Sequence, residues 1–225
     1  MKVLTISLLK DGDRRSRFLE QFQSEGISFS FVDAVDGRSA TTKEYYNHAA
    51  NENYLFNRRW IISPSEYGCK ASHQKALEEF IYNSDEEFLL VCEDDITIDS
   101  SLKKFIKKLE GESSSLSEDD LVIHLGGQDG LANSRRLIKF SQKVIANREV
   151  FKVFPLTLRW LYRTCAYVVN RSAAQKILAV HQKHNFVVDD WAFIRKRTGI
   201  SNIYFCDIVR HPDELLNSNI ESERQ

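Results

Sequence analysis

Residues 87–99, EFLLVCEDDITID, run from a short apolar stretch directly into Glu93, Asp94 and Asp95. The apolar stretch predicts a buried strand, and the three carboxylates stand at its carboxyl end. Like charges about 4 Å apart repel by roughly 4 kcal/mol at an effective dielectric constant of 20. Such a cluster must be solvated, protonated or bound to a cation. The stretch therefore predicts a sheet strand and, at its end, a candidate cation site.

The bulk composition predicts one large domain in a reducing compartment. The chain has 225 residues, of which 42% are hydrophobic and 11% aromatic, enough for a substantial core. The 31 basic and 32 acidic residues nearly balance, so no overall field favours nucleic acid, and we expect no such partner. The four cysteines are widely spaced and form no C-x-x-C pair, which predicts reduced thiols. The first fifteen residues fit neither a signal peptide nor a membrane span, so we expect a cytoplasmic protein, at most peripheral to the inner face of the membrane.

Strand and helix signals alternate along the first third of the chain. Residues 3–9 and 27–33 predict strands on either side of a helix whose Phe18, Leu19 and Phe22 face inward. A second helix then opens with a capping box: Ser63 is the expected N-cap, Pro64 the first helical residue and Glu66 the reciprocal partner. This order is typical of an α/β sheet.

The remainder continues the same pattern with one irregular region. The runs LVIHLGG at 121–127 and RTCAYVVN at 163–170 predict further strands, the second leading into a helix capped by Asn170. A basic helix and a serine-rich acidic loop precede them, and a short strand near NIYFC and a polar tail end the chain. Residues from about 126 to 163 are predicted to be irregular. We therefore predict a single α/β domain over residues 1–225, with helices on both faces of the sheet.

The position of the acids favours a metal site. In open α/β sheets, ligands collect beyond the carboxyl ends of the strands. Mg²⁺ and Mn²⁺ prefer oxygen ligands and often complete their shells with substrate phosphates. The alternative is a solvated loop, or acids that favour the dipole of a helix beginning near Asp99. The residues alone leave both readings open.

Several further motifs follow one another in a specific order. These are LLKDGDRR, AVDGR, EYGCKASH, LLVCEDD, TCAYVVNRSAAQKIL and VVDDW. Together they resemble glycosyltransferase family 25, the lipooligosaccharide galactosyltransferase type, from residue 1 to about residue 211. The resemblance departs from the family pattern at Ser7, where an asparagine is usual, and at Glu93, where an aspartate is usual.

The resemblance implies a GT-A type, Rossmann-like nucleotide-sugar-binding fold with a mixed central sheet flanked by helices. It implies a UDP-sugar donor, most often UDP-galactose, and Mn²⁺ or Mg²⁺ held by the acidic motif. The expected metal ligands are Glu93, Asp95 and His211. The expected donor-binding residues are Ser7, Leu8, Arg14, Asp36, Gly37, Ser72, His73 and Asp94.

Several of these residues have a structural alternative. Arg14 is either a solvated charge on a helix or a phosphate or uracil contact. Asp36 and Gly37 also suit an ordinary turn, with Asp36 capping and Gly37 at positive φ. His73 also suits a half-buried position on a helix, and His211 a surface loop.

An inverting transferase needs a carboxylate that removes the proton of the acceptor hydroxyl. Asp189 and Asp190 are the candidates, because they follow an apolar segment and precede Trp191, whose ring could stack on a sugar. The alternative is that Asp189 caps the following helix and Trp191 packs in the core.

The predicted function is metal-assisted, inverting transfer of galactose from UDP-galactose to a lipooligosaccharide or another cell-surface glycan or glycolipid. The acidic cluster alone also suits a metal-dependent phosphohydrolase or nucleotidyltransferase, and the sheet without a base suits a non-catalytic nucleotide-sugar-binding module. The basic segment Lys103 to Lys108 either touches anionic lipid or is a solvated helix face.

Overall fold

The computed structural model describes residues 1–49, 62–112, 116 and 119–211. Most of the predicted serine-rich acidic loop and the predicted polar tail lie outside the described residues. The helices and strands, with 3₁₀ turns labelled η, are β1 (Lys2–Ser7), α1 (Gly12–Ser24), β2 (Ser30–Asp33), η1 (Gly37–Ser39), α2 (Thr42–Ala49), α3 (Pro64–Asn83), β3 (Phe88–Glu93), α4 (Ser100–Gly111), β4 (Leu121–Gly126), η3 (Ala132–Arg136), β5 (Lys139–Ile145), β6 (Arg148–Val153), η4 (Pro155–Trp160), β7 (Ala166–Asn170), α6 (Arg171–Lys183), α7 (Trp191–Thr198) and β8 (Asn202–Val209).

The described strands form one mixed sheet of eight strands in the order β2-β1-β3-β7-β4-β8-β6-β5. Strand β1 runs parallel to β2 and β3, whereas β7 is antiparallel to both β3 and β4. Strand β8 runs parallel to β4. The carboxyl ends of β1, β3, β4 and β8 therefore meet at one edge of the sheet, where the acids that end β3 lie.

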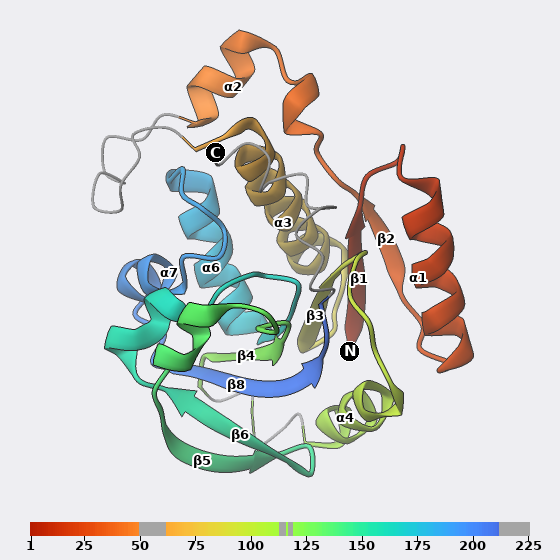
Figure 1. Cartoon of the computed structure of the whole chain (residues 1–225), viewed down its shortest axis with the longest axis vertical. Helices are drawn as coiled ribbons and strands as arrows, with labels where there is room; N and C mark the ends of the chain where they lie inside the picture. Colours follow the sequence, from red (N-terminus) through yellow and green to blue (C-terminus); the bar gives the residue numbers. More distant parts are fainter. Residues whose placement is uncertain (50–61, 113–115, 117–118, 212–225) are drawn as a thin grey trace.

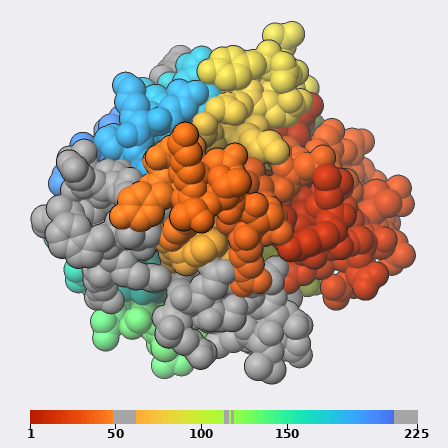
Figure 2. All heavy atoms as spheres, turned by 90° about the horizontal axis from the view of Figure 1, so that it is seen from above, coloured from red at the N-terminus to blue at the C-terminus, as the bar shows by residue number. Residues whose placement is uncertain are grey.

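Helices cover both faces of the sheet, as predicted (Figure 1). One face packs against the apolar sides of α1 and α4, with Phe18, Phe22 and Phe105 in that core. The other face packs against α3, α6 and α7, with Leu77, Ile177 and other apolar side chains in a second core. Helix α2, orange in Figure 2, lies over α3 when the molecule is viewed from above. The predicted GT-A type architecture, a mixed sheet flanked by helices, is confirmed.

Most of the predicted local signals are confirmed. The capping box of α3 forms: Ser63 accepts a hydrogen bond from the backbone of Glu66, and the Glu66 carboxylate accepts one from Ser63. Asn170 caps α6 as expected. The prediction for Leu19 is wrong, because this side chain is 39% exposed while Phe18 and Phe22 fill the core.

The prediction that residues 126–163 are irregular is wrong as well. They hold an antiparallel hairpin of β5 and β6, joined by Ala146 and Asn147, whose φ angles of 51° and 58° suit a primed turn. The side chains of β5 are exposed on both faces until Ile145, so no alternation of apolar and polar residues marks the strand. The predicted short strand near NIYFC is the eight-residue β8, which lies between β4 and β6.

All four cysteines, Cys69, Cys92, Cys165 and Cys206, are free thiols, as the sequence predicts. No helix in the described ranges is both long and apolar enough to cross a membrane.

Two glycines allow α3 and η1 to approach closely. A Cβ atom at Gly37 would lie 1.8 Å from the carbonyl oxygen of Pro64, and one at Gly68 would lie 2.6 Å from that of Val35. Gly37 does not have the predicted positive φ. A side chain at position 37 has no room, because the backbone of α3 lies directly against this residue.

We expect Gly68→Ala to destabilise the fold by about 1–3 kcal/mol, because overpacking against backbone atoms forces a shift of α3. At this chain length each kcal/mol lowers Tm by about 2–4 °C. Gly12→Ala is the matched control, since nothing lies within 4 Å of a Cβ at that position. A thermal melt in which the two variants behave alike would contradict the close-approach explanation.

Lys70 is a charged residue in the core, 5% exposed, with its Nζ 3.5 Å from Asn185 Oδ1. Burial lowers the pKa of Lys70 from 10.5 to about 8. Between these two values the unfolded chain holds a proton that the folded chain has lost, so stability rises with pH across this window. At pH 7, therefore, the folded protein carries an unfavourable buried charge.

We expect Lys70→Met to stabilise the protein by on the order of 1–2 kcal/mol at pH 7, and to lose most of this gain by pH 10. Urea denaturation at the two pH values measures the difference. Lys104→Met, at an exposed position of α4, is the control. An equal gain at both pH values would show that packing, not charge, is responsible.

Candidate functional site

A cavity of about 720 Å³ lies at the edge of the sheet where β1 and β3 end. Its walls come from the loops after β1, β2 and β3, from the first turns of α3, and from the segments that precede β7 and α7. Of the residues predicted to form the site, those that line this cavity are Ser7, Leu8, Arg14, Asp36, Gly37, Ser72, Glu93, Asp94, Asp95, Asp189 and His211. His73 and Asp190 do not line it.

Asp94 joins the ends of β1 and β3. Its carboxylate accepts a hydrogen bond from the Ser7 hydroxyl and lies 3.3 Å from Nη1 of Arg14. Burial raises the pKa of Asp94, although Ser7 and Arg14 act in the opposite direction. Ser7 is thus engaged within the protein, and the departure from the family's asparagine places a hydroxyl on Asp94.

Asp95 lies beside two basic side chains. Its Oδ2 lies 3.5 Å from Nη1 of Arg14 and 3.4 Å from Nε2 of His211. Burial acts to raise the pKa of Asp95, but the hydrogen bond and charge of His211, together with Arg14, lower it overall. Arg14 therefore offsets part of the negative charge in the cluster.

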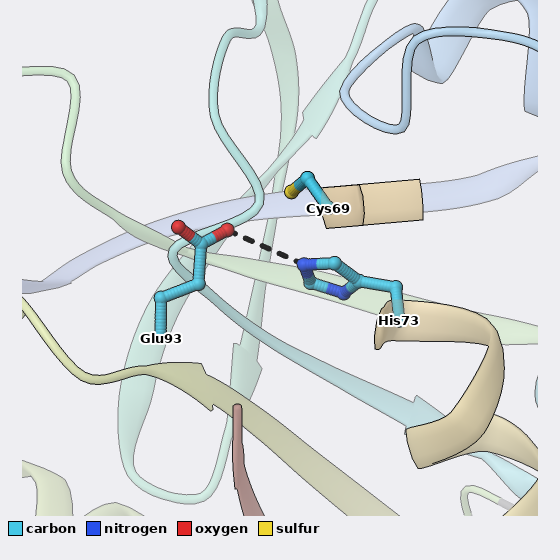
Figure 3. A group of neighbouring side chains, drawn as sticks. All are labelled: Cys69, His73 and Glu93. Atoms are coloured by element: carbon cyan, nitrogen blue, oxygen red, sulfur yellow. Dashed lines mark hydrogen bonds and ion pairs between the residues drawn. The ribbon is translucent and has the colours of Figure 1, made fainter. Parts of the chain in front are cut away.

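Glu93 belongs to a buried hydrogen-bonded network (Figure 3). Its Oε1 lies 3.3 Å from Nε2 of His73 and accepts a hydrogen bond of 2.9 Å from the Thr164 hydroxyl. The other ring nitrogen of His73 lies 3.0 Å from the hydroxyl of Tyr167. His73 is fully buried, so the structure does not support its predicted contact with the donor. Instead, His73 positions the Glu93 carboxylate through the contact between Nε2 and Oε1.

Cys69 lies one helical turn before His73, with its sulfur facing Glu93 (Figure 3). One ligand atom from each of Cys69, His73 and Glu93 lies within 4.8 Å of the others, close enough to share a metal ion. A thiolate and an imidazole favour softer ions such as Zn²⁺ over Mn²⁺. Burial, followed by the charge of Glu93, raises the pKa of the Cys69 thiol well above its usual value, which disfavours the thiolate. The contacts of His73 and Glu93 with each other, with Tyr167 and with Thr164 explain why these side chains lie together.

Asp189 and Asp190 have different positions. Asp189 lines the cavity, and its Oδ2 accepts a hydrogen bond of 3.0 Å from the backbone N–H of Arg163. Asp190 is the N-cap of α7 and accepts a hydrogen bond from the backbone of Phe193. The alternative prediction that Asp189 caps this helix is therefore wrong, because Asp190 is the cap. Trp191 is 1% exposed and packs in the core, so it cannot stack on a sugar.

The loop after β2 forms another wall of the cavity. Asp36 caps η1, as one of its two readings predicts, and forms an ion pair of 2.5 Å with Lys10. The hydrogen bond from Lys10 lowers the pKa of Asp36. The Ser72 hydroxyl accepts a hydrogen bond of 2.8 Å from the N–H of Val35. Ser72 thereby fixes this loop against α3.

The sequence gives little sign of Arg163, which also lines the cavity. Its φ is 62°, unusual for a residue with a side chain, and its Nη1 donates to the carbonyl of Gly127. Its own carbonyl lies 2.8 Å from Nε2 of His124, whose pKa burial lowers to about 4. A strained backbone held in this way is common at functional sites. No sequence motif signals such a conformation.

The acidic motif meets a structural test for a hard divalent cation. Asp95 Oδ1 is a buried atom with no hydrogen-bond partner among the described residues, which is costly for a carboxylate. The predicted ligands Glu93, Asp95 and His211 offer oxygen and nitrogen atoms, a donor set that suits Mn²⁺. The residues present therefore fit the ion that the resemblance implies.

Comparisons with known proteins agree with the motif analysis. The sequence profile of Glycosyltransferase family 25 (LPS biosynthesis protein) matches residues 1–192. Procollagen galactosyltransferase 2 of Homo sapiens is 27% identical over 185 residues, which cover 80% of this chain but only 28% of that relative. A Haemophilus influenzae protein named "Putative glycosyltransferase" is 25% identical over 97% of this chain and 75% of its own length. The mouse "Inactive glycosyltransferase 25 family member 3" is 26% identical over 84% of this chain and 30% of its own length.

Among solved structures, a glycosyltransferase involved in glycosylation of the major capsid of PBCV-1 has a TM-score of 0.41 to this chain. It is 10% identical, and the match covers 99% of this chain and 95% of that one. A likeness this distant concerns the arrangement of the sheet and carries no argument about the reaction.

Proposed function

Because the chain belongs to glycosyltransferase family 25, we propose that it transfers galactose from UDP-galactose to a hydroxyl of a lipooligosaccharide or another cell-surface glycan, with inversion. The proposal includes assistance by Mn²⁺ or Mg²⁺ and action in the cytoplasm. The chain spans only about 28% of procollagen galactosyltransferase 2, so the activity in that relative's name comes to this chain only as part of the proposal.

The observation that carries the proposal is the shared cavity of the acidic motif and Asp189. About 720 Å³ lies within the range of small-molecule sites, and the volume suits a nucleotide sugar. Glu93 and Asp95 come from the end of β3, whereas Asp189 comes from the segment before α7. The proposed metal ligands and a separate carboxylate therefore line one cavity, and this arrangement supports the proposed inverting transfer.

The donor diphosphate needs positive charge as it leaves. Bound at Glu93, Asp95 and His211, a divalent cation would act as a Lewis acid toward the diphosphate oxygens. The chain adds cationic side chains of its own, since Lys10, Arg14 and Arg38 also line the cavity. We assign a donor contact to Arg14 on this basis, and to Leu8, Asp36 and Gly37 because they line the same cavity. Ser7 positions Asp94, and Ser72 positions the loop after β2.

Asp189 is the proposed general base. Its carboxylate lines the cavity and is oriented by the hydrogen bond from the backbone N–H of Arg163. As the hydroxyl oxygen attacks the anomeric carbon, its proton passes to Asp189 and the bond to the UDP oxygen breaks. Asp190 is committed to the cap of α7 and takes no part in this transfer.

The test is incubation with UDP-galactose, Mn²⁺ and an oligosaccharide panel, with UDP and free phosphate measured separately. We expect UDP release that depends on acceptor, and NMR of the product that shows a β-linkage. Phosphate release without acceptor would favour a hydrolase. UDP binding without transfer to any acceptor would favour a non-catalytic module, a state named in some relatives.

A further inference from the structure

The hairpin β5–β6 and the turns around it concentrate two kinds of exposed side chain. Of nine large hydrophobic residues exposed in the described chain, five lie between residues 138 and 156. They are Ile138 at 52%, Phe140 at 54%, Val144 at 64%, Phe154 at 38% and Leu156 at 75% exposure. Exposed apolar groups gathered in this way mark a contact surface more often than chance placement does.

The same segment carries a strong local charge. Residues 131–163 contain eight basic residues and one acidic residue, a local charge of +7 in a chain whose net charge is −1. The exposed basic residues of the segment are Arg135, Arg136, Lys139, Lys143 and Arg159. These five, with the five exposed apolar residues, are called the hairpin surface below.

The hairpin surface lies at an open edge of the molecule. β5 is the last strand of the sheet and pairs only with β6 among the described strands, at the lower edge in Figure 1. The pairing register of β5 shifts at Phe140, whose ring meets that of Phe154 edge to face at 5.9 Å on one face of the hairpin, whereas Val144 lies on the other face. Lys139 lies on the face of Val144, with its Nζ 4.2 Å from the centre of the Phe205 ring, and Lys143 lies on the opposite face, so both faces of this edge strand carry apolar and basic side chains.

We propose that the hairpin surface docks on an anionic phospholipid membrane. Apolar and aromatic side chains enter the headgroup region, and the surrounding arginines and lysines pair with lipid phosphates. An anionic membrane satisfies both features at once. Two copies of the chain paired through this same surface do not, since the two hairpin surfaces carry the same positive charge and repel each other.

This placement differs from the lipid contact predicted at residues 103–108. Helix α4 does expose Lys103, Lys104, Lys107 and Lys108, but its apolar residues Leu102, Phe105 and Leu109 are fully buried in the core. It therefore offers charge without an apolar group to insert. The hairpin surface offers both, and its segment also reaches the cavity, which Ala132 and Tyr162 line.

The test is co-sedimentation of the full chain with vesicles of phosphatidylcholine alone or with 30% phosphatidylglycerol (roughly the anionic fraction that gives a strong surface potential). We expect binding only to the anionic vesicles. The double variant Val144→Ser with Leu156→Ser should weaken binding at least about tenfold, because it removes apolar area that enters the headgroup region. The double variant Arg135→Gln with Lys143→Gln should also weaken it at least about tenfold, because each basic residue near the surface contributes several-fold. None of these side chains lines the cavity, so transfer to a water-soluble acceptor should be unchanged.

Two matched controls test whether the effect is specific to the hairpin surface. They remove an exposed apolar side chain, or two positive charges, elsewhere on the molecule. Tyr82→Ser removes an apolar side chain that is 67% exposed on α3, and Lys103→Gln with Lys107→Gln removes the same charge from α4. Both should bind vesicles like the wild type. Equal binding to neutral vesicles, a loss with the α4 variant but not the hairpin variants, or hairpin variants that alter only the oligomeric state would each overturn the proposal.

Discussion

Asp95→Asn is expected to lower kcat/KM for galactosyl transfer by roughly 10²–10³-fold, the usual cost of losing one group that stabilises developing charge. The buried Oδ1 of Asp95 has no hydrogen-bond partner within the described ranges and is offered to the proposed cation. Its other oxygen lies 3.5 Å from Arg14 and 3.4 Å from His211. The change to an amide keeps the size of the side chain but removes its charge. The measurement is UDP release under subsaturating donor and acceptor.

Asp85→Asn is the matched control, because it makes the same chemical change at an exposed position before β3. It should retain wild-type activity. If Asp95→Asn kept full activity while remaining folded in a thermal melt, the assignment of Asp95 to the metal would be wrong.

The second large effect is expected at Asp189. Asp189→Asn should reduce kcat by roughly 10²–10⁴-fold, the contribution of a general base, while the affinity for UDP stays close to that of the wild type. The amide oxygen of asparagine can still accept the hydrogen bond from Arg163, so the cavity wall should keep its shape. Steady-state kinetics combined with calorimetric UDP binding separates the two quantities.

Asp190→Asn provides the comparison within the same dipeptide. Asparagine is nearly as good an N-cap as aspartate, so α7 should form and kcat should change little. The reverse outcome, a large loss at Asp190 and none at Asp189, would move the base to the residue that the geometry excludes.

The sequence predicts the parts of the site that follow directly from local rules. An apolar run that ends in acids specifies a strand and the position of its carboxylates, and the capping box at Ser63 and Glu66 specifies where α3 begins. Parallel strands then bring Ser7 and Asp94 together, because the ends of β1 and β3 lie side by side. These contacts need only the order of strands.

What the sequence leaves open depends on contacts between distant segments. Arg14 has the local pattern of any charge on a helix, and only the packing of α1 beside β3 places it on Asp94 and Asp95. The hairpin β5–β6 lacks both alternation and a glycine turn, so it reads as irregular. The division of roles between Asp189 and Asp190 depends on where α7 begins, a boundary that local rules place only to within a residue or two.

The most direct measurement is calorimetric titration of UDP with and without Mn²⁺, on the wild type and on Asp95→Asn. If the acids at the end of β3 hold a cation that engages the diphosphate, Mn²⁺ should tighten UDP binding to the wild type at least about tenfold, equivalent to about 1.4 kcal/mol, and should leave the variant almost unaffected. Wild-type protein that binds UDP equally well in Mn²⁺ and in EDTA would contradict the account.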